Sequence, residues 1–128
     1  MRSAANEQLI LAMWEDYERE GTTGLLRWAA QDARWRAHSA GGRISRGTAL
    51  YCQEVERARD AGVRAAGLRD EMWSHDDVVV VRGRTREDAQ LYWLHRVRDR
   101  KVVWTSSSPD LSRLLLEAGL EPSLTPWH

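Results

Sequence analysis

Seven tryptophans in a chain of 128 residues without phenylalanine constrain the fold more than any other feature. Each indole ring buries a large apolar area and carries one N–H that seeks an acceptor. The rings fall on segments of different periodicity. Helical segments carry Trp14 and Trp28, extended segments carry Trp35, Trp73, Trp93 and Trp104, and the C-terminal tail carries Trp127. Since only a wrapped arrangement of helices and strands brings such rings together, we expect them to surround one shared pocket.

The length and charge of the chain narrow the possible classes of protein. A chain of 128 residues suits one domain over 1–128, with a core of about 7–120 and a tail of 121–128. The 19 acidic and 19 basic residues balance, so neither nucleic acid nor a membrane surface is an expected partner. No apolar run approaches the ~18 residues that span a bilayer. The single cysteine excludes an intramolecular disulfide, and a cytoplasmic location fits.

Helical spacing dominates the N-terminal half. Apolar residues repeat through 10–17 at helical intervals, with Asn6 as a plausible cap and Gly21 as the end of the helix. A second helix follows from Thr22, and a third spans 48–62. These segments predict three helices before the chain becomes extended.

Extended segments lie on both sides of the third helix. Before it come a short strand over 33–38 and a loop over 39–47. After it come four consecutive strands at 63–73, 77–85, 89–98 and 101–106. The short connections between those four strands predict antiparallel pairing. Ser108 followed by Pro109 then predicts the start of a last helix, whose buried stripe includes Leu114 and Leu115.

This order of elements resembles the nuclear-transport-factor-2-like superfamily, in particular its SnoaL-like and ketosteroid-isomerase-like branch. The resemblance is carried by EREG at 18–21 and by the segments 32–50, 91–104 and 109–120. It implies an α+β fold (a cystatin-like roll) in which a curved antiparallel sheet forms a cone-shaped half-barrel. Three helices from the N-terminal half close the cone, and a C-terminal helix follows the sheet. It also implies a pocket in the open end and a homodimer through the outer sheet face.

The catalytic groups of that branch do not carry over to this sequence. The tyrosine position falls on Trp14, the carboxylate base on Ala37 and the second acid near Trp93. Steroid-type isomerisation is therefore not expected. Epoxide-hydrolase relatives need a set of two aspartates and one arginine. Arg69 and Asp70 could supply two of these residues, but neighbours on a strand point to opposite faces, and the sequence offers no convincing third member.

Histidines are the remaining candidates for chemistry. On the strand 89–98, His95 shares a face with Trp93 by the period of two, and this face is the better candidate for a cavity wall. Desolvation there would lower the pKa of His95 and keep it neutral, able to act as a base or to orient a ligand carbonyl. The alternative is a core histidine hydrogen-bonded to a neighbour. His38 is the second candidate, although strict alternation with Trp35 points it away from the pocket unless a bulge re-aims it.

Two hypotheses for function follow. In the first, the protein binds a small apolar or aromatic molecule and catalyses an acid/base isomerisation, cyclisation or hydration through His95 and His38. In the second, it is a non-enzymatic ligand-sensing or dimerisation module. No cofactor is expected, and no cluster with metal-ligand spacing appears. The expected ligand-binding residues are aromatic with one exception: Trp14, Tyr17, Trp28, Trp35, Tyr51, Val55, Trp73, Trp93 and Trp104.

Overall fold

The structure of the protein is a computed structural model that describes residues 1–37, 44–60, 64–65, 72–84 and 90–119. Helices occupy α1 (Ala4–Glu20), α2 (Thr22–Leu26), α3 (Thr48–Asp60) and α4 (Leu111–Glu117). Strands occupy β1 (Ala29–Ala37), β2 (Ile44–Arg46), β3 (Arg64–Ala65), β4 (Met72–His75), β5 (Val78–Arg84), β6 (Gln90–Arg98) and β7 (Lys101–Ser108).

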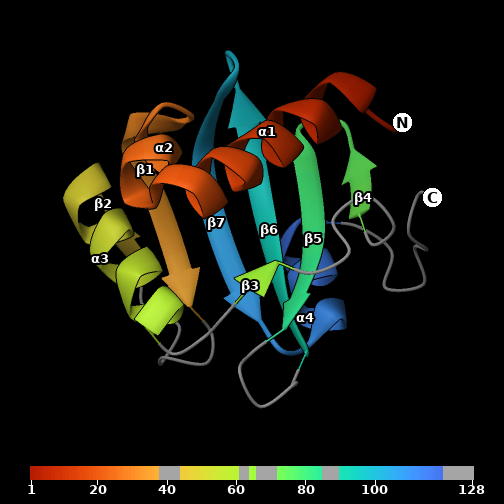
Figure 1. Cartoon of the computed structure of the whole chain (residues 1–128). Helices are drawn as coiled ribbons and strands as arrows, with labels where there is room; N and C mark the ends of the chain where they lie inside the picture. Colours follow the sequence, from red (N-terminus) through yellow and green to blue (C-terminus); the bar gives the residue numbers. More distant parts are fainter. Residues whose placement is uncertain (38–43, 61–63, 66–71, 85–89, 120–128) are drawn as a thin grey trace.

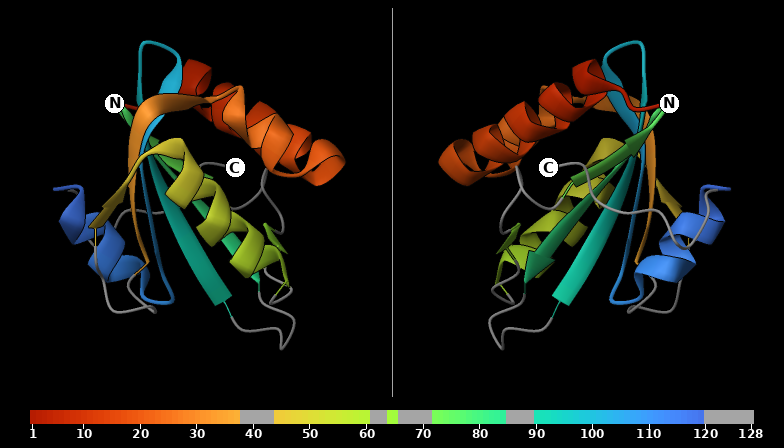
Figure 2. Two further views of the ribbon diagram at one scale, coloured as in Figure 1. Left: turned by 90° about the vertical axis from the view of Figure 1, so that its left-hand side faces the viewer. Right: turned by 90° about the vertical axis from the view of Figure 1, so that its right-hand side faces the viewer.

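The strands form one curved, open sheet with helices on both faces (Figure 1). Its order is β2-β1-β7-β6-β5-β3, with β4 paired to β5 beside that path. The strands from β4 to β7 pair antiparallel as predicted, whereas β1 runs parallel to β7. Figure 2 shows α1, α2 and α3 on one side of the sheet and α4 on the other. The predicted α+β class, with its curved sheet and helical cover, is confirmed.

Two apolar clusters lie on opposite faces of this sheet. The inner cluster lies between the sheet and the N-terminal helices, and the outer cluster lies between the sheet and α4. Strand β6 contributes residues to both clusters, because Trp93 and Val97 point inward while Leu94 points outward. On α4, Leu114 and Leu115 are fully buried, which confirms the predicted stripe.

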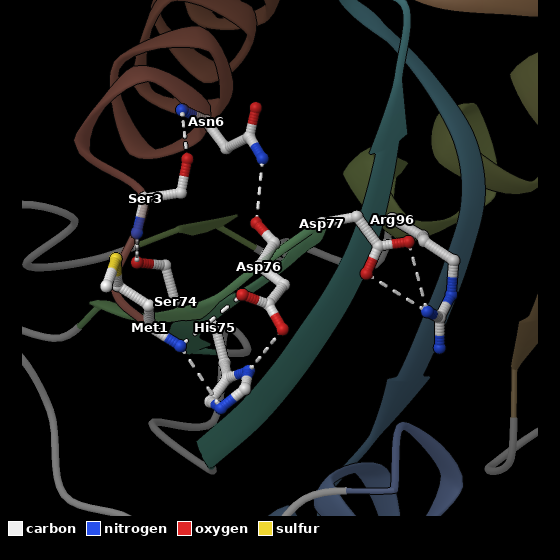
Figure 3. A network of polar contacts seen from close by, with 8 residues as sticks. All are labelled: Met1, Ser3, Asn6, Ser74, His75, Asp76, Asp77 and Arg96. Atoms are coloured by element: carbon white, nitrogen blue, oxygen red, sulfur yellow. Dashed lines mark hydrogen bonds and ion pairs between the residues drawn. The ribbon is translucent and has the colours of Figure 1, made fainter.

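Two helices begin at caps that differ from the predicted ones. The side chain of Ser3 caps α1 by accepting a hydrogen bond from the backbone N–H of Asn6 (Figure 3). The side-chain amide of Asn6, the predicted cap, instead donates to the backbone carbonyl of Asp76 over 2.9 Å. Asp110 caps α4, because pairing with β6 holds Ser108 in strand β7. The predicted end of α1 at Gly21 is confirmed, with φ of 72°.

The N-terminal segment is hydrogen-bonded to strand β4 and to the turn that follows it. The backbone N–H of Ser3 donates to Oγ of Ser74 over 3.0 Å, and the terminal amine lies 3.4 Å from a carboxylate oxygen of Asp76 (Figure 3). Beside them, Glu7 pairs with Arg2 and accepts from Ser74, which lowers the pKa of Glu7, chiefly through the Arg2 hydrogen bond. These contacts fix α1 across the inner face of the sheet.

Three strand boundaries differ from the predicted ones. The segment expected as one strand at 63–73 forms the separate strands β3 and β4, which pair with different stretches of β5. Strand β2 lies inside the predicted loop 39–47 and pairs with β1 on the side opposite β7. Strand β1 begins at Ala29 rather than Ala33, because Ala29 pairs with Val102 of β7.

Candidate functional site

His95 lies at the centre of the inner face and is 1% exposed. Its ring is held from two sides. Nε1 of Trp14 on α1 donates to Nε2 of His95 over 3.3 Å, and Nδ1 of His95 lies 2.9 Å from Oγ1 of Thr105 on β7. Since Nε2 accepts the indole proton, Nδ1 carries the imidazole proton and donates it to Thr105.

Burial sets the protonation state of this histidine. Desolvation lowers the pKa of His95 to about 3, so the ring is neutral near pH 7, as predicted from its apolar strand face. Both ring nitrogens are already hydrogen-bonded in this state. To accept a proton from a ligand, the ring would first have to lose its bond with Trp14. The geometry matches the alternative of a core histidine bonded to its neighbours.

Aromatic rings pack around this hydrogen bond. The centre of the Trp14 ring lies 4.9 Å from the centre of the Trp93 ring and 5.7 Å from that of the Tyr17 ring, and both pairs have edge-to-face geometry. Tyr17 follows Trp14 by three residues, so the two rings share one face of α1. Edge contacts of this kind add to the free energy of burying the rings. The rings predicted on α1 and β6 therefore meet.

Three more predicted residues contact the same inner cluster. Trp28, Trp35 and Val55 are partly buried against it, from the turn between α2 and β1, from β1 and from α3. Trp28 therefore lies just beyond the helix predicted to carry it. Nε1 of Trp28 donates to Asp16 over 2.9 Å, and this bond is the main cause of the lowered pKa of Asp16. Two predicted positions fall outside the description: all of His38, and the side chain of Tyr51.

Trp73 and Trp104 are not in the inner cluster, so the prediction that all these rings surround one pocket is wrong for both. Trp73 is opposite Val80, which is opposite Leu94, and this row faces α4. On β7, the pairing with β6 shifts by one residue, so that Val102 and Thr105 face inward while Trp104 faces outward. This bulge is the physical reason for the different face of Trp104.

The same bulge explains why sequence analysis missed Thr105 as the partner of His95. The tight turn at 99–100 pairs Arg98 with Lys101, and an unbroken register from there would place His95 opposite Trp104. The extra residue Val103 moves Thr105 into that position. No spacing in the sequence marks this shift.

Open hollows border the helical side of the molecule. One of about 410 Å³ lies along α1 beside Trp14, Glu15 and Glu18. Another of about 500 Å³ lies along α3 and includes Cys52 and Glu56. Among the described residues, no three histidine, cysteine or acidic side chains gather closely enough to hold a metal ion. Within the same ranges, no helix has the length and apolar character needed to cross a bilayer.

Comparison with known proteins finds similarity at the level of structure. No protein-family model and no curated protein sequence matches the chain. A solved NTF2-like protein of unknown function from Burkholderia pseudomallei is 19% identical over 89% of this chain and 97% of its own, with a TM-score of 0.65. TerC, co-crystallised with polyporic acid, is 23% identical over 80% of this chain and 89% of its own, with a TM-score of 0.62.

A third solved structure has a different small molecule bound. It is a hypothetical protein with a ketosteroid isomerase-like fold from Catenulispora acidiphila, in complex with trimethylamine. It is 17% identical over 93% of this chain and 98% of its own, with a TM-score of 0.58. The chain thus has the NTF2-like fold that ketosteroid isomerase-like proteins share.

Proposed function

We propose that the protein binds a small apolar or aromatic molecule on the inner face of its sheet. The observation that supports this proposal best is the packing of Trp14, Tyr17 and Trp93 beside a buried, neutral His95. Small-molecule sites are mostly apolar and aromatic, with a few polar groups that orient the ligand. A shallow hollow along α1, lined by Trp14, Glu15, Glu18 and Arg19, reaches one ring of this cluster.

Two proteins of the same fold support the class of ligand. TerC was crystallised with polyporic acid, and the protein from Catenulispora acidiphila with trimethylamine. Both ligands are small organic molecules. They support small-molecule binding as a class.

We favour binding without turnover over catalysis, because of the environment of His95. Trp14 and Thr105 occupy its two nitrogens, and burial disfavours the imidazolium that a general base would have to form. An acid/base isomerisation, cyclisation or hydration stays the second candidate. In that case the ligand would displace the Trp14 indole from His95 before the proton moves.

Calorimetric titration tests the proposal. The probes are polyporic acid, trimethylamine and a panel of neutral aromatic compounds, each titrated into the intact chain. We expect saturable binding of at least one aromatic probe, weakened about 10-fold or more by Trp93→Leu, since a lost aromatic contact and its buried area amount to at least ~1.4 kcal/mol. Trp104→Leu, on the outer face, is the matched control and should leave the affinity unchanged.

The possible outcomes separate the two candidate functions. Absence of saturable binding by every probe would contradict the proposal. Chromatography of each bound probe after incubation from pH 5 to 9 then tests for turnover. A product that disappears in His95→Gln would favour the catalytic candidate over simple binding.

Assembly and location complete the proposal. We propose a cytoplasmic protein that forms a homodimer through the outer face of its sheet. Arg34 and Arg36 on β1 flank the ring of Trp104 there, each with its guanidinium carbon 5.9 Å from the ring centre. Light scattering should give twice the mass of the chain, and Arg34→Glu should shift the protein toward the monomer.

A further inference from the structure

Trp35 has a buried indole N–H without an acceptor among the residues that the structure describes. Such groups are rare, because a buried donor that loses its bond to water without gaining another costs about 1–3 kcal/mol. Two other indole N–H groups of the inner cluster are hydrogen-bonded. Trp14 donates to His95 and Trp28 donates to Asp16.

The position of Trp35 places it beside the polar centre of the inner face. Trp35 on β1 is opposite Thr105 on β7, and Thr105 is opposite His95 on β6. The three residues therefore form one row across neighbouring strands, which lie side by side in Figure 1. Since the Trp35 ring packs against the inner apolar cluster, its side chain lies on the face proposed to receive the ligand.

The charges around this row of residues indicate which kind of ligand atom could accept a hydrogen bond from Trp35. Among the side chains whose burial the structure describes, no arginine or lysine is buried, and His95 is neutral, so these residues bring no buried positive charge to the inner cluster. An anionic ligand would lose its hydration there without gaining a counter-charge. A neutral oxygen, such as the carbonyl of a ketone, a quinone or an amide, needs only one N–H donor.

We propose that Nε1 of Trp35 donates a hydrogen bond to a neutral carbonyl oxygen of an otherwise apolar ligand. This inference rests on the proposed function and names the ligand class for the same site. The apolar body of the ligand lies against the rings of Trp14 and Trp93, and the bond to Trp35 fixes its orientation. Trp35 is thus a binding residue that distinguishes a carbonyl compound from the hydrocarbon of the same shape.

Matched ligand pairs test this inference on the intact chain. The probes are 1-indanone with indane and 9-fluorenone with fluorene, which differ only in the carbonyl group. Calorimetry gives the affinity ratio of ketone to hydrocarbon for the wild type, for Trp35→Phe and for the outer-face control Trp104→Phe. One neutral hydrogen bond predicts that the ratio falls about 2- to 10-fold in Trp35→Phe and stays constant in Trp104→Phe.

A second measurement needs no variant that must fold. The indole ¹H–¹⁵N resonance of Trp35, assigned through bonds in the wild-type protein, should move downfield when a ketone binds and move less with the hydrocarbon. If both members of a pair bind, with an unchanged ratio in Trp35→Phe and no difference in this resonance, the inference is wrong and the proposed function stands. If no probe of either pair and no panel compound binds, the proposed function and the inference fail together.

Discussion

Nε1 of Trp14 donates a hydrogen bond to Nε2 of His95 over 3.3 Å, joining residues 81 positions apart in the sequence. The bond ties helix α1 to the central strand β6 through two buried side chains. It also fixes the histidine tautomer, because the nitrogen that accepts the indole proton cannot carry one. Helix position and imidazole protonation are therefore linked in this fold.

Replacement of His95 by alanine should destabilise the protein by about 3 kcal/mol. The change removes the acceptor of the Trp14 indole, removes the ring that contacts Thr105 and leaves a cavity in a fully buried position. Urea unfolding measures the loss. His75→Ala, at a position whose side chain is 41% exposed, is the control and should cost less than about 0.5 kcal/mol. Equal stabilities of the two variants would contradict a structural role for His95.

The stability of the protein should fall as the pH is lowered from neutral. The pKa of His95 is about 3 in the folded protein, against an ordinary value of 6.5 in the unfolded chain. Unfolding therefore takes up a proton between these two values, so this contribution is complete above pH 6.5 and is lost toward pH 3. In that window we expect a slope of up to about 1.4 kcal/mol per pH unit.

Urea unfolding at pH 7.5, 5.5 and 4.5 measures this slope for the wild type and for His95→Gln. The variant lacks the titrating ring, so its stability should depend less on pH over the same range. A long-range ¹H–¹⁵N spectrum of the imidazole gives an independent check, since the neutral ring with its proton on Nδ1 should persist at pH 5. Parallel pH profiles of the two proteins would show that His95 does not carry the effect.

Periodicity explains which parts of the site could be predicted from the sequence. Spacing of three and four residues identifies the buried face of α1 with Trp14 and Tyr17, and spacing of two identifies the face of β6 with Trp93 and His95. Once an apolar strand face contains a histidine, its neutral state follows from desolvation. These predictions depend only on regular structure, and the structure confirms them.

Features that depend on irregular structure could not be predicted in this way. The bulge at Val103 reverses the face of Trp104 and brings Thr105 to His95, yet no residue type marks it. The pairing of Trp73 with Val80 likewise depends on how β4 aligns with β5. That Trp35 finds no acceptor among the described residues depends on the positions of surrounding atoms, which a single sequence does not contain.

Addition of one methyl group at Gly24 should separate α2 from α1. A Cβ atom at Gly24 would lie 2.7 Å from the backbone carbonyl carbon of Asp16, which is closer than real Cβ atoms approach. Because the obstacle is backbone, we expect Gly24→Ala to cost about 1–3 kcal/mol, measured by urea unfolding. Thr23→Ala, at the exposed neighbour on the same helix, should change the stability little. A Gly24→Ala protein as stable as the wild type would mean that the two helices can move apart freely.

The contribution of α4 to the outer cluster can be measured with two leucines on the same helix. Leu114 is fully buried against the sheet, whereas Leu116 is 64% exposed. We expect Leu114→Ala to lower the free energy of unfolding by about 2–4 kcal/mol, since it removes buried methyl groups and leaves a cavity. Leu116→Ala has the same helix propensity change but little buried area, so it should cost less than about 0.5 kcal/mol. A similar loss in both variants would place the effect in the helix itself rather than in its packing on Trp73 and Leu94.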